Sequence, residues 1–305
     1  AQAESIVVSG CTFHGNTGSA VLLDGINGNI EIKYSNFTDN NATFRALLEI
    51  LSFPSHSNQF CNVSVSRCVF EKNRGQSIYM RIEPNMVKVP VSFTMTDCSF
   101  LHNTLNYSSA VTIRVESKRE YLRFESIAVT GCTFQGNTGG CVLLDQVTGN
   151  VEFENCNFTE NNSGLRAGLS VNTFHFRLKV SVSKCVFEKN RGQSVNLYID
   201  MYIFRSHGGI APVSFELTEC SFLHNTLNDV EFDTNDQGIV MINGSMLVTS
   251  IVVTGCTFQG NTGSAVRLND LFGKVKFENC KFTENIATYG AGLAIVEYKL
   301  WECSD

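Results

Sequence analysis

The sequence has little of several features that would assign it to a common functional class. It holds no run of about 18 apolar residues, which excludes a membrane-spanning helix. Only 17% of its residues are charged, the net charge is −6, and one short stretch at 117–123 is basic. A nucleic-acid-binding protein needs a positive surface, so that class is also excluded. Proline occurs four times and tryptophan once, at Trp301.

Apolar residues and small turn-forming residues make up the rest of the 305-residue chain. Hydrophobic residues account for 43% of the sequence, including 23 phenylalanines, beside 24 glycines and many asparagines. That composition predicts a folded chain with a buried core and many tight turns.

A short motif recurs along the whole chain, in which asparagine follows phenylalanine by three residues. The pairs begin with Phe13 and Asn16, and Phe134 with Asn137 and Phe258 with Asn261 lie in near-identical segments such as "CTFQGNTG". Two residues before each phenylalanine is a slot that holds cysteine in every unit but one, where it holds Ser35. The slot cysteines are Cys11, Cys68, Cys98, Cys132, Cys156, Cys185, Cys220, Cys256 and Cys280.

Each unit reads as three short strands. Apolar residues lie three and five positions before the slot, as Val63 and Val65 do before Cys68, which is the period of a strand with one buried face. The phase then slips by one residue, which indicates a bend, and Cys-x-Phe resumes the alternation. Asparagine tolerates the left-handed region, so we expect it to form the next turn. A third strand follows, as in "GSAVLL".

Successive phenylalanines of the motif are 24 to 36 residues apart. Three strands in 24 residues leave no room for a helix, and such a unit cannot close a core alone, so units must stack on one another. The sequence therefore predicts an all-β fold, a single-stranded parallel β-helix of about ten coils with three short strands per coil. The longer coils are expected to insert their extra residues at one place, between the third strand and the next first strand.

A larger repeat is superimposed on the coils. The segment "VSVSRCVFEKNRGQS" returns as "VSVSKCVFEKNRGQS", and "CSFLHNTLN" occurs twice. We interpret residues 1–305 as one β-helix domain in which a four-coil block of about 122 residues is repeated two and a half times, at 1–121, 122–245 and 246–305.

The F-x-x-N motif paired with G-G-A-I-like segments resembles the repeat of chlamydial polymorphic membrane proteins. It is also similar to β-helix repeats of secreted animal proteins, within the pectin-lyase-like class. The resemblance implies a right-handed β-helix. It implies little about activity, because this fold hosts lyases, hydrolases, tailspikes and adhesins.

Cysteine is the first candidate for chemistry. The slot cysteines would stack as a ladder at about 4.8 Å per coil, with parallel Cβ vectors that disfavour disulfides. We therefore expect buried free thiols, with Cys141 as a further inward residue, and no metal site, since the spacing offers none of the short ligand motifs. Cys61 and Cys303 lie off the ladder, and whether either forms a disulfide, for example between molecules, is left open.

The other polar candidates also favour a structural interpretation. Asparagine in every coil predicts a ladder of side-chain amides, because a specific site is made once and a structural element many times. The acidic stretch 229–236 could bind calcium but lacks the features of an EF-hand loop, so a solvated loop is favoured. No set of carboxylates or histidines recurs at one lateral position. We therefore expect no enzyme activity and no cofactor.

Two further sets of residues concern the surface. N-x-S/T sequons permit glycosylation of a secreted or cell-surface protein, at a frequency that chance alone would give. They are Asn36, Asn41, Asn62, Asn106, Asn157, Asn161 and Asn243. Aromatic residues in the inserts suggest an interaction edge, with strand lengthening as the alternative. They are Phe53, Phe60, Tyr121, Phe174, Phe176, Tyr198, Tyr202 and Phe204.

The function expected from these patterns is structural. We expect an extracellular adhesive rod or fibre subunit that associates with itself, end to end or laterally, or with other extracellular proteins or glycans. Strand edges at uncapped coil ends favour the end-to-end form. The alternative is a carbohydrate-active or carbohydrate-binding β-helix of the pectin-lyase-like class, which a groove with three or more carboxylates would favour.

Overall fold

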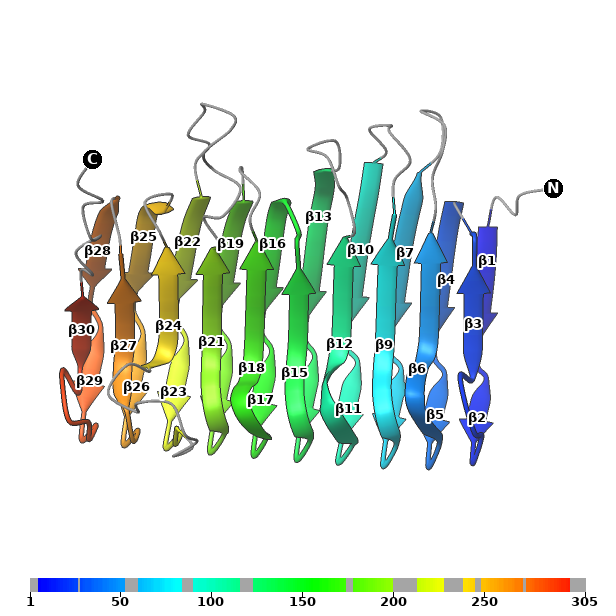
Figure 1. Ribbon diagram of the computed structural model, residues 1–305, viewed down its shortest axis with the longest axis horizontal. Helices are drawn as coiled ribbons and strands as arrows, with labels where there is room; N and C mark the ends of the chain where they lie inside the picture. Colours follow the sequence, from blue (N-terminus) through cyan, green and yellow to red (C-terminus); the bar gives the residue numbers. More distant parts are fainter. Residues whose placement is uncertain are drawn as a thin grey trace, which may run out of the picture.

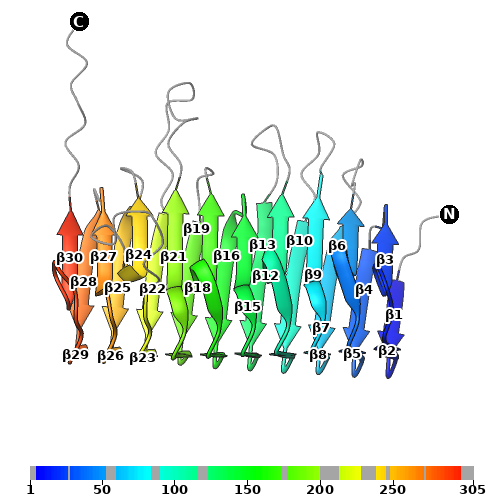
Figure 2. The ribbon, with the colours of Figure 1, turned by 60° about the horizontal axis from the view of Figure 1, so that its bottom comes forward.

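A computed structural model describes ten stretches of the chain, at 5–26, 28–52, 60–83, 90–115, 123–173, 178–199, 213–227, 238–244, 248–270 and 273–296. Their regular structure is strand throughout, arranged as three ten-stranded sheets whose neighbouring strands are parallel. The sheets run side by side along one axis, and the coils follow chain order from one end of the stack to the other (Figures 1 and 2).

Every coil contributes one strand to each sheet. Sheet A contains β1 (Ser5–Ser9), β4 (Gly28–Lys33), β7 (Cys61–Ser66), β10 (Pro90–Thr96), β13 (Arg123–Thr130), β16 (Gly149–Glu154), β19 (Leu178–Ser183), β22 (Val213–Thr218), β25 (Val248–Thr254) and β28 (Lys274–Glu278). Sheet B contains β2 (Thr12–His14), β5 (Asn36–Thr38), β8 (Val69–Glu71), β11 (Ser99–Leu101), β14 (Thr133–Gln135), β17 (Asn157–Thr159), β20 (Val186–Glu188), β23 (Ser221–Leu223), β26 (Thr257–Gln259) and β29 (Lys281–Thr283). Sheet C contains β3 (Val21–Asp24), β6 (Asn41–Ser52), β9 (Arg74–Ile82), β12 (Thr104–Val115), β15 (Thr138–Asp145), β18 (Asn162–Thr173), β21 (Arg191–Ile199), β24 (Gly238–Gly244), β27 (Ser264–Asn269) and β30 (Leu293–Val296).

The pairing is in register from coil to coil, so equivalent residues of successive coils lie beside one another. In sheet B, for example, Phe70 pairs with Phe100 and Phe100 with Phe134. This confirms the predicted parallel β-helix of ten coils with three strands each. The sheets continue without a break across 121 and 245, and the division into blocks stays a prediction from the sequence.

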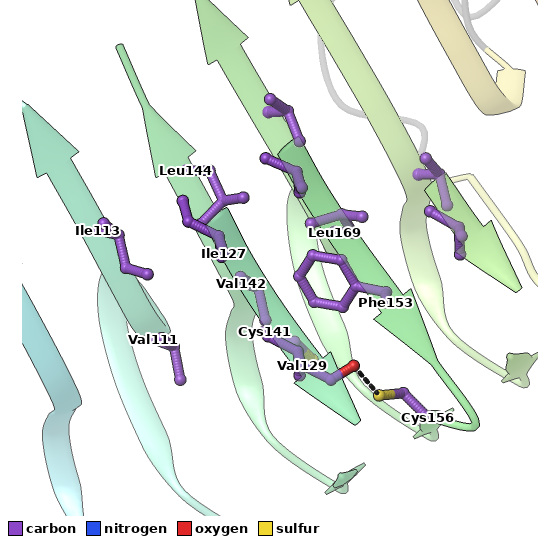
Figure 3. Packing of buried hydrophobic residues seen from close by; sticks show 14 of the residues in the cluster. Val111, Ile113, Ile127, Val129, Cys141, Val142, Leu144, Phe153, Cys156 and Leu169 are labelled. Carbon is purple, nitrogen blue, oxygen red and sulfur yellow. Dashed lines mark hydrogen bonds between the residues drawn. The ribbon is translucent and has the colours of Figure 1, made fainter. Parts of the chain in front are cut away.

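Identical side chains stack inside the rod because of this register. The ten motif phenylalanines, Phe13 to Phe282, form one stack with ring centroids 4.6–4.9 Å apart and nearly parallel planes. Aliphatic rows from sheets A and C fill the rest of the core, as Ile127, Val129 and Leu144 do beside Phe153 (Figure 3). Each stacked aromatic pair adds about 0.5–1.5 kcal/mol beyond the burial of its area.

Two residues per coil adopt the left-handed conformation and turn the chain into and out of sheet B. The first precedes the slot and forms the A–B corner, as Lys184 does with φ 52°, and the second precedes the ladder asparagine and forms the B–C corner, as Lys189 does with φ 53°. The expectation that the asparagine itself is left-handed is wrong. The residue before it turns the chain, and this leaves the asparagine in a conformation that directs its amide inward.

Glycine occupies two of these corners where a side chain of the preceding coil lies against the backbone. A Cβ on Gly136 would lie 2.4 Å from His102 Nδ1, and one on Gly131 would lie 2.6 Å from Asp97 Oδ1. A larger residue at either corner would require the side chain of His102 or Asp97 to move aside.

The ladder asparagines bind the coils through both ends of their amides. Nδ2 of Asn103 donates to the backbone oxygen of Phe70 at 2.9 Å and to Oδ1 of Asn137 at 3.0 Å, and the backbone nitrogen of Asn103 donates to the same Oδ1. The pattern repeats from Asn16 to Asn285, and those from Asn40 to Asn261 are buried. Each asparagine thus satisfies backbone groups of two neighbouring coils.

The extra residues of the longer coils lie at two places, which corrects the expectation of one. Some connect sheet C to the next strand of sheet A, as predicted. Others lie between the asparagine turn and sheet C, where the pairing shifts between Ala42 and Ala46, between Thr104 and Ser109, and between Asn162 and Arg166. Bulges of this kind re-aim side chains and often lie beside functional sites.

Replacement of a ladder asparagine should destabilise the rod much more than replacement of an exposed one in the same coil. We predict that Asn161→Ala lowers stability by about 2–4 kcal/mol, because it leaves buried backbone groups unpaired in two coils. Asn157→Ala is the matched control, because Asn157 is an exposed asparagine in the same coil. It should change stability by less than about 0.5 kcal/mol. Urea denaturation followed by circular dichroism measures both. Equal midpoints for the two variants would contradict the role given to the ladder.

Candidate functional site: the outer face of sheet C

The nine slot cysteines form an internal thiol row. Seven of them, Cys68 to Cys256, are buried, Cys11 and Cys280 are half-buried, and all are free. From Cys68 to Cys280 each slot Sγ lies near two backbone oxygens: Cys156 Sγ is 3.4 Å from Val129 O (Figure 3) and 3.4 Å from Glu154 O. Ser35 fills the slot of its coil in the same way and donates to Lys33 O at 2.9 Å.

Contacts with Cys156 and Cys98, together with burial, raise the pKa of the Cys132 thiol above its ordinary value. The carbonyl oxygens around the sulfurs of the row would likewise repel a thiolate and accept a hydrogen bond from a thiol. We therefore expect the whole row to be protonated and unreactive at neutral pH.

The off-row cysteines are also poor candidates for reaction. Cys141 and Cys61 are both fully buried, and burial raises the pKa of both thiols, for Cys61 to about 11. A disulfide from Cys61 to another molecule would require the start of β7 to open. Cys303 lies outside the described residues, as do the acidic stretch 229–236 and Trp301.

The sequons differ in accessibility. Asn36, Asn41, Asn62 and Asn157 are exposed, and Asn243 is half-buried and accepts a hydrogen bond from Asn269. Asn161 is a ladder asparagine with no exposed surface, so the prediction that it can be glycosylated is wrong for the folded protein. The side chain of Asn106 is outside the described part of the structure.

The proposed aromatic edge lies mostly beyond what the structure describes. Phe53, Tyr121, Phe174, Phe176, Tyr202 and Phe204 fall outside the described residues. Phe60 is half-buried immediately before β7, and Tyr198 is 40% exposed on β21. Tyr198 is therefore the member of the edge with a defined, accessible position.

Tyr198 belongs to a row of outward side chains on sheet C. The register places Arg114 beside Asp145, Asp145 beside Asn172, and Asn172 beside Tyr198, on four successive coils. A second outward row lies two residues earlier in each strand and includes Ser170 and Asn196, which are paired neighbours. We call the outward side chains of these strands, β12, β15, β18 and β21, the sheet C face.

Charged groups meet at one end of the sheet C face. Nε of Arg114 lies 2.7 Å from Oδ2 of Asp145, whose side chain is only 15% exposed. Arg166 comes from the bulge of β18, and burial lowers its pKa, although the charge of Asp145 and the nearby Tyr198 oppose that shift. One carboxylate thus interacts with two guanidinium groups that arrive from different strands.

Amide and hydroxyl groups continue the face toward Tyr198. Nδ2 of Asn196 is 3.4 Å from Oγ of Ser170, and Ser170 Oγ is 3.5 Å from Oδ1 of Asn172. Ser170 and Asn196 are 2% and 3% exposed although they point away from the core, so neighbouring outward groups cover them. The arrangement holds its donors and acceptors fixed beside an exposed phenol ring.

The sheet C face occurs once, unlike the elements of the rod. The residues equivalent to Arg114, Asn172 and Tyr198 in other blocks include Asn243, Leu51 and Arg81, whereas Asp145 recurs as Asp24, so it is the combination that occurs once among the described coils. On sheet B, by contrast, the outward residues of β8 and β20 are identical, as are those of β11 and β23. Comparison of equivalent positions between blocks is the sequence signal that would have found this face.

The polar and aromatic groups of the face could bind a ligand. Guanidinium, amide and carboxylate groups fix polar groups of a ligand, and an exposed tyrosine offers a flat apolar surface to a sugar ring or side chain. Asp145 is the single carboxylate in the cluster, whereas hydrolysis of glycosides generally uses a pair. Among the described residues no three histidine, cysteine or acidic side chains are placed to hold a metal ion.

A family model described as the right-handed β-helix region matches residues 56–299. The chain belongs to this family. The match supplies the right-handed sense that sheet pairing alone leaves open, and it covers about four-fifths of the sequence. Within the described residues there is no helix with the length and hydropathy to cross a membrane.

Two solved structures of the surface adhesin PfbA of Streptococcus pneumoniae are similar to this chain. Their sequence identities are 10% and 9%, with TM-scores of 0.34 and 0.35. The similarity covers 96% of this chain and 91% and 83% of theirs. At these values the likeness bears on neither partner nor activity. None of the curated proteins matches the chain, and the resemblance to chlamydial polymorphic membrane proteins stays a prediction.

Deprotonation of Cys61 should destabilise the fold at alkaline pH. Its raised pKa means that the folded state favours the thiol, so this stabilisation is complete below about pH 9 and is lost as pH rises toward 11. We predict a loss of up to about 3 kcal/mol across that window, which Cys61→Ser should reduce. Urea midpoints at several pH values measure this effect. Cys11→Ser is the control, and equal slopes for both variants would contradict the assignment.

Proposed function

We propose that the protein is a non-enzymatic extracellular rod that binds a partner through the sheet C face. The observation that carries this proposal is the contrast between repeated and unique positions. Phenylalanine, asparagine and cysteine recur in coil after coil and stabilise the rod, whereas Arg114, Asp145 and Tyr198 lie together once. A set of outward polar groups that differs from its own repeats favours a specific contact.

The shape of the face favours an extended partner. Its rows run along the rod axis, and Arg114 and Tyr198 are three coils apart, about 14 Å. A polysaccharide chain or an extended protein segment could contact both ends at once. Stacking on tyrosine together with hydrogen bonds to amides and guanidinium groups favours a glycan over an apolar peptide.

The charge pattern supports binding without turnover. Asp145, the one carboxylate of the face, is paired with Arg114 at 2.7 Å, so its Oδ2 is already held by a guanidinium group of the protein. The enzyme alternative, a carbohydrate-active β-helix, would require a second acidic group. Glu49 is the nearest comparable buried carboxylate on sheet C, and it lies three coils away, where it bonds Ser19 and Arg45.

The proposed location outside the cell is supported by the surface rather than by the fold. Asn62 is an exposed sequon on β7 of sheet A, where a glycan would project away from the rod. The slot thiols from Cys68 to Cys256 are buried, which protects them from an oxidising medium. Self-association through the ends or sides is part of the same proposal.

Removal of the aromatic platform should abolish ligand binding without loss of the fold. We predict that Tyr198→Ala lowers affinity for a glycan identified on an array of extracellular polysaccharides by at least tenfold, and that Arg114→Ala has a similar effect. Tyr289→Ala removes a tyrosine that is 63% exposed away from this face and serves as the control. Equal binding by all three variants would overturn the assignment of the face.

The same glycan tests the absence of turnover. Incubation with the wild-type protein should release no new reducing or unsaturated ends. If ends appear and Asp145→Asn stops their release, the enzyme alternative replaces the binding rod.

A further inference from the structure

A charge pattern with a period of four coils runs along the B–C corner, on the opposite flank of sheet B from the A–B corner. In chain order the corner carries glycine, an acidic residue, lysine and histidine, and then repeats. Its members are Gly15, Asp39, Lys72, His102, Gly136, Glu160, Lys189, His224, Gly260 and Glu284. Backbone hydrogen bonds such as Lys72 N to Leu101 O align them from coil to coil. The B–C corner of sheet B therefore carries acidic and basic residues in a fixed order that repeats every four coils.

The charged corner groups are available to a partner. The side chains of Asp39, Lys72 and Lys189 are 54%, 62% and 56% exposed. Lys72 and Lys189 contact the glutamate next to each in sequence, at 3.1 and 3.2 Å. Such exposed neighbouring pairs contribute about 0–1 kcal/mol, so a partner can exchange them at little cost.

This pattern is complementary to itself when two rods lie antiparallel. The coils are numbered 1 to 10 from the N-terminus, so that Lys72 lies in coil 3 and Lys189 in coil 7. If coil n of one copy faces coil 9 − n of the other, Lys72 lies opposite Glu160, and Lys189 lies opposite Asp39. His102 lies opposite Gly136, which the His102 ring of that same copy covers, so the two rings meet at the two-fold axis. A shift by one block, with coil n opposite coil 13 − n, pairs Lys72 with Glu284 and Lys189 with Glu160.

Other arrangements bring like charges together. Parallel rods in the same register would place Lys72 opposite Arg67, and Lys189 opposite Lys184. An antiparallel arrangement shifted by one coil, with n opposite 10 − n, would place Lys72 opposite Lys189. Like-charge contacts oppose association and suppress wrong registers.

The A–B corner is compatible with the favoured register. With n opposite 9 − n, Tyr34 faces Lys184, Arg67 faces Asn155, and Asp97 faces Gly131. Asp97 covers Gly131 of its own copy, so the two Asp97 carboxylates approach each other at the two-fold axis. Arg67 lies 3.7 Å from Asp97 within each copy and offsets this contact, and the cation–aromatic pair is favourable. Eight overlapping coils, about 38 Å long and about 18 Å across, bring roughly 700 Å² of each copy together, close to the standard interface size.

We propose that a second copy of this chain docks antiparallel on sheet B, through an isologous contact whose register the charged bands set. The contact leaves the sheet C face of both copies open, so the pair would present two ligand faces. The proposal rests on the corner residues and is independent of the ligand proposed for sheet C. Its energy is largely electrostatic, so association should weaken as salt concentration rises.

Charge exchange tests this contact directly. One variant carries Lys72→Glu and Lys189→Glu, and the other carries Asp39→Lys, Glu160→Lys and Glu284→Lys. Both exchanges place residue types that already occupy left-handed corners of this chain, so the backbone should accept them. In sedimentation velocity at low salt we expect the wild type to dimerise and each variant alone to associate at least tenfold more weakly. An equimolar mixture of the two variants should regain the dimer.

Two controls separate the contact from general charge effects. Lys179→Glu with Lys276→Glu makes the same charge change on sheet A and should leave the dimer intact. Circular dichroism checks that each variant is folded. A wild type that sediments as a monomer at every concentration, or a mixture that stays monomeric, would overturn the proposal. Glycan binding by Tyr198→Ala reads the sheet C face separately, so either proposal can fail alone.

Discussion

The parallel, in-register stacking of one coil on the next constrains all other features of this rod. A strand spacing near 4.8 Å places each inward side chain directly against its equivalent, so each inward row must be compatible with itself. Phenylalanine meets this condition by stacking its rings 4.6–4.9 Å apart. Asparagine meets it because one amide both donates and accepts along the row. Cysteine and Ser35 meet it by donating to backbone oxygens instead of to one another.

The same constraint explains how much of the fold the sequence could predict. A row compatible with itself keeps the same residue in every coil, and this identity is visible as a period even in one sequence. The coil number, the three strands and the thiol row follow from it. The turn conformation was predicted wrongly because asparagine tolerates a left-handed φ, but here its amide is needed inward. The preceding residue, whose side chain points to solvent and is free to vary, takes the strained position instead, as Lys72 and Glu160 do.

The sheet C face could not be predicted from the period, because outward residues need not match their neighbours. Arg114, Asp145, Asn172 and Tyr198 lie on four coils and share no motif, and only the register brings them together. Arg166 reaches the face through a bulge that no spacing rule anticipates, since the extra residues of β18 could equally have lengthened a connection. Among the insert aromatics, Tyr198 lies within the third strand of its coil, β21, as the strand-lengthening alternative expects, and its part in an interaction edge stays a prediction.

Duplication of a four-coil block has a physical consequence beyond the length of the rod. Copying the block also copies its surface charges. Each acidic coil and each basic coil of one block therefore recurs four coils later, about 19 Å along the axis. This pattern is complementary to itself when a second copy is turned end for end, because the acidic coils of one copy then lie opposite the basic coils of the other. A single block offers one acidic–basic pair, and salt readily screens the attraction of so few charges. Two blocks offer several at once and penalise registers that differ by one coil. The repeat that stabilises the rod from within can therefore also give its surface a preferred partner, a second copy of the same chain.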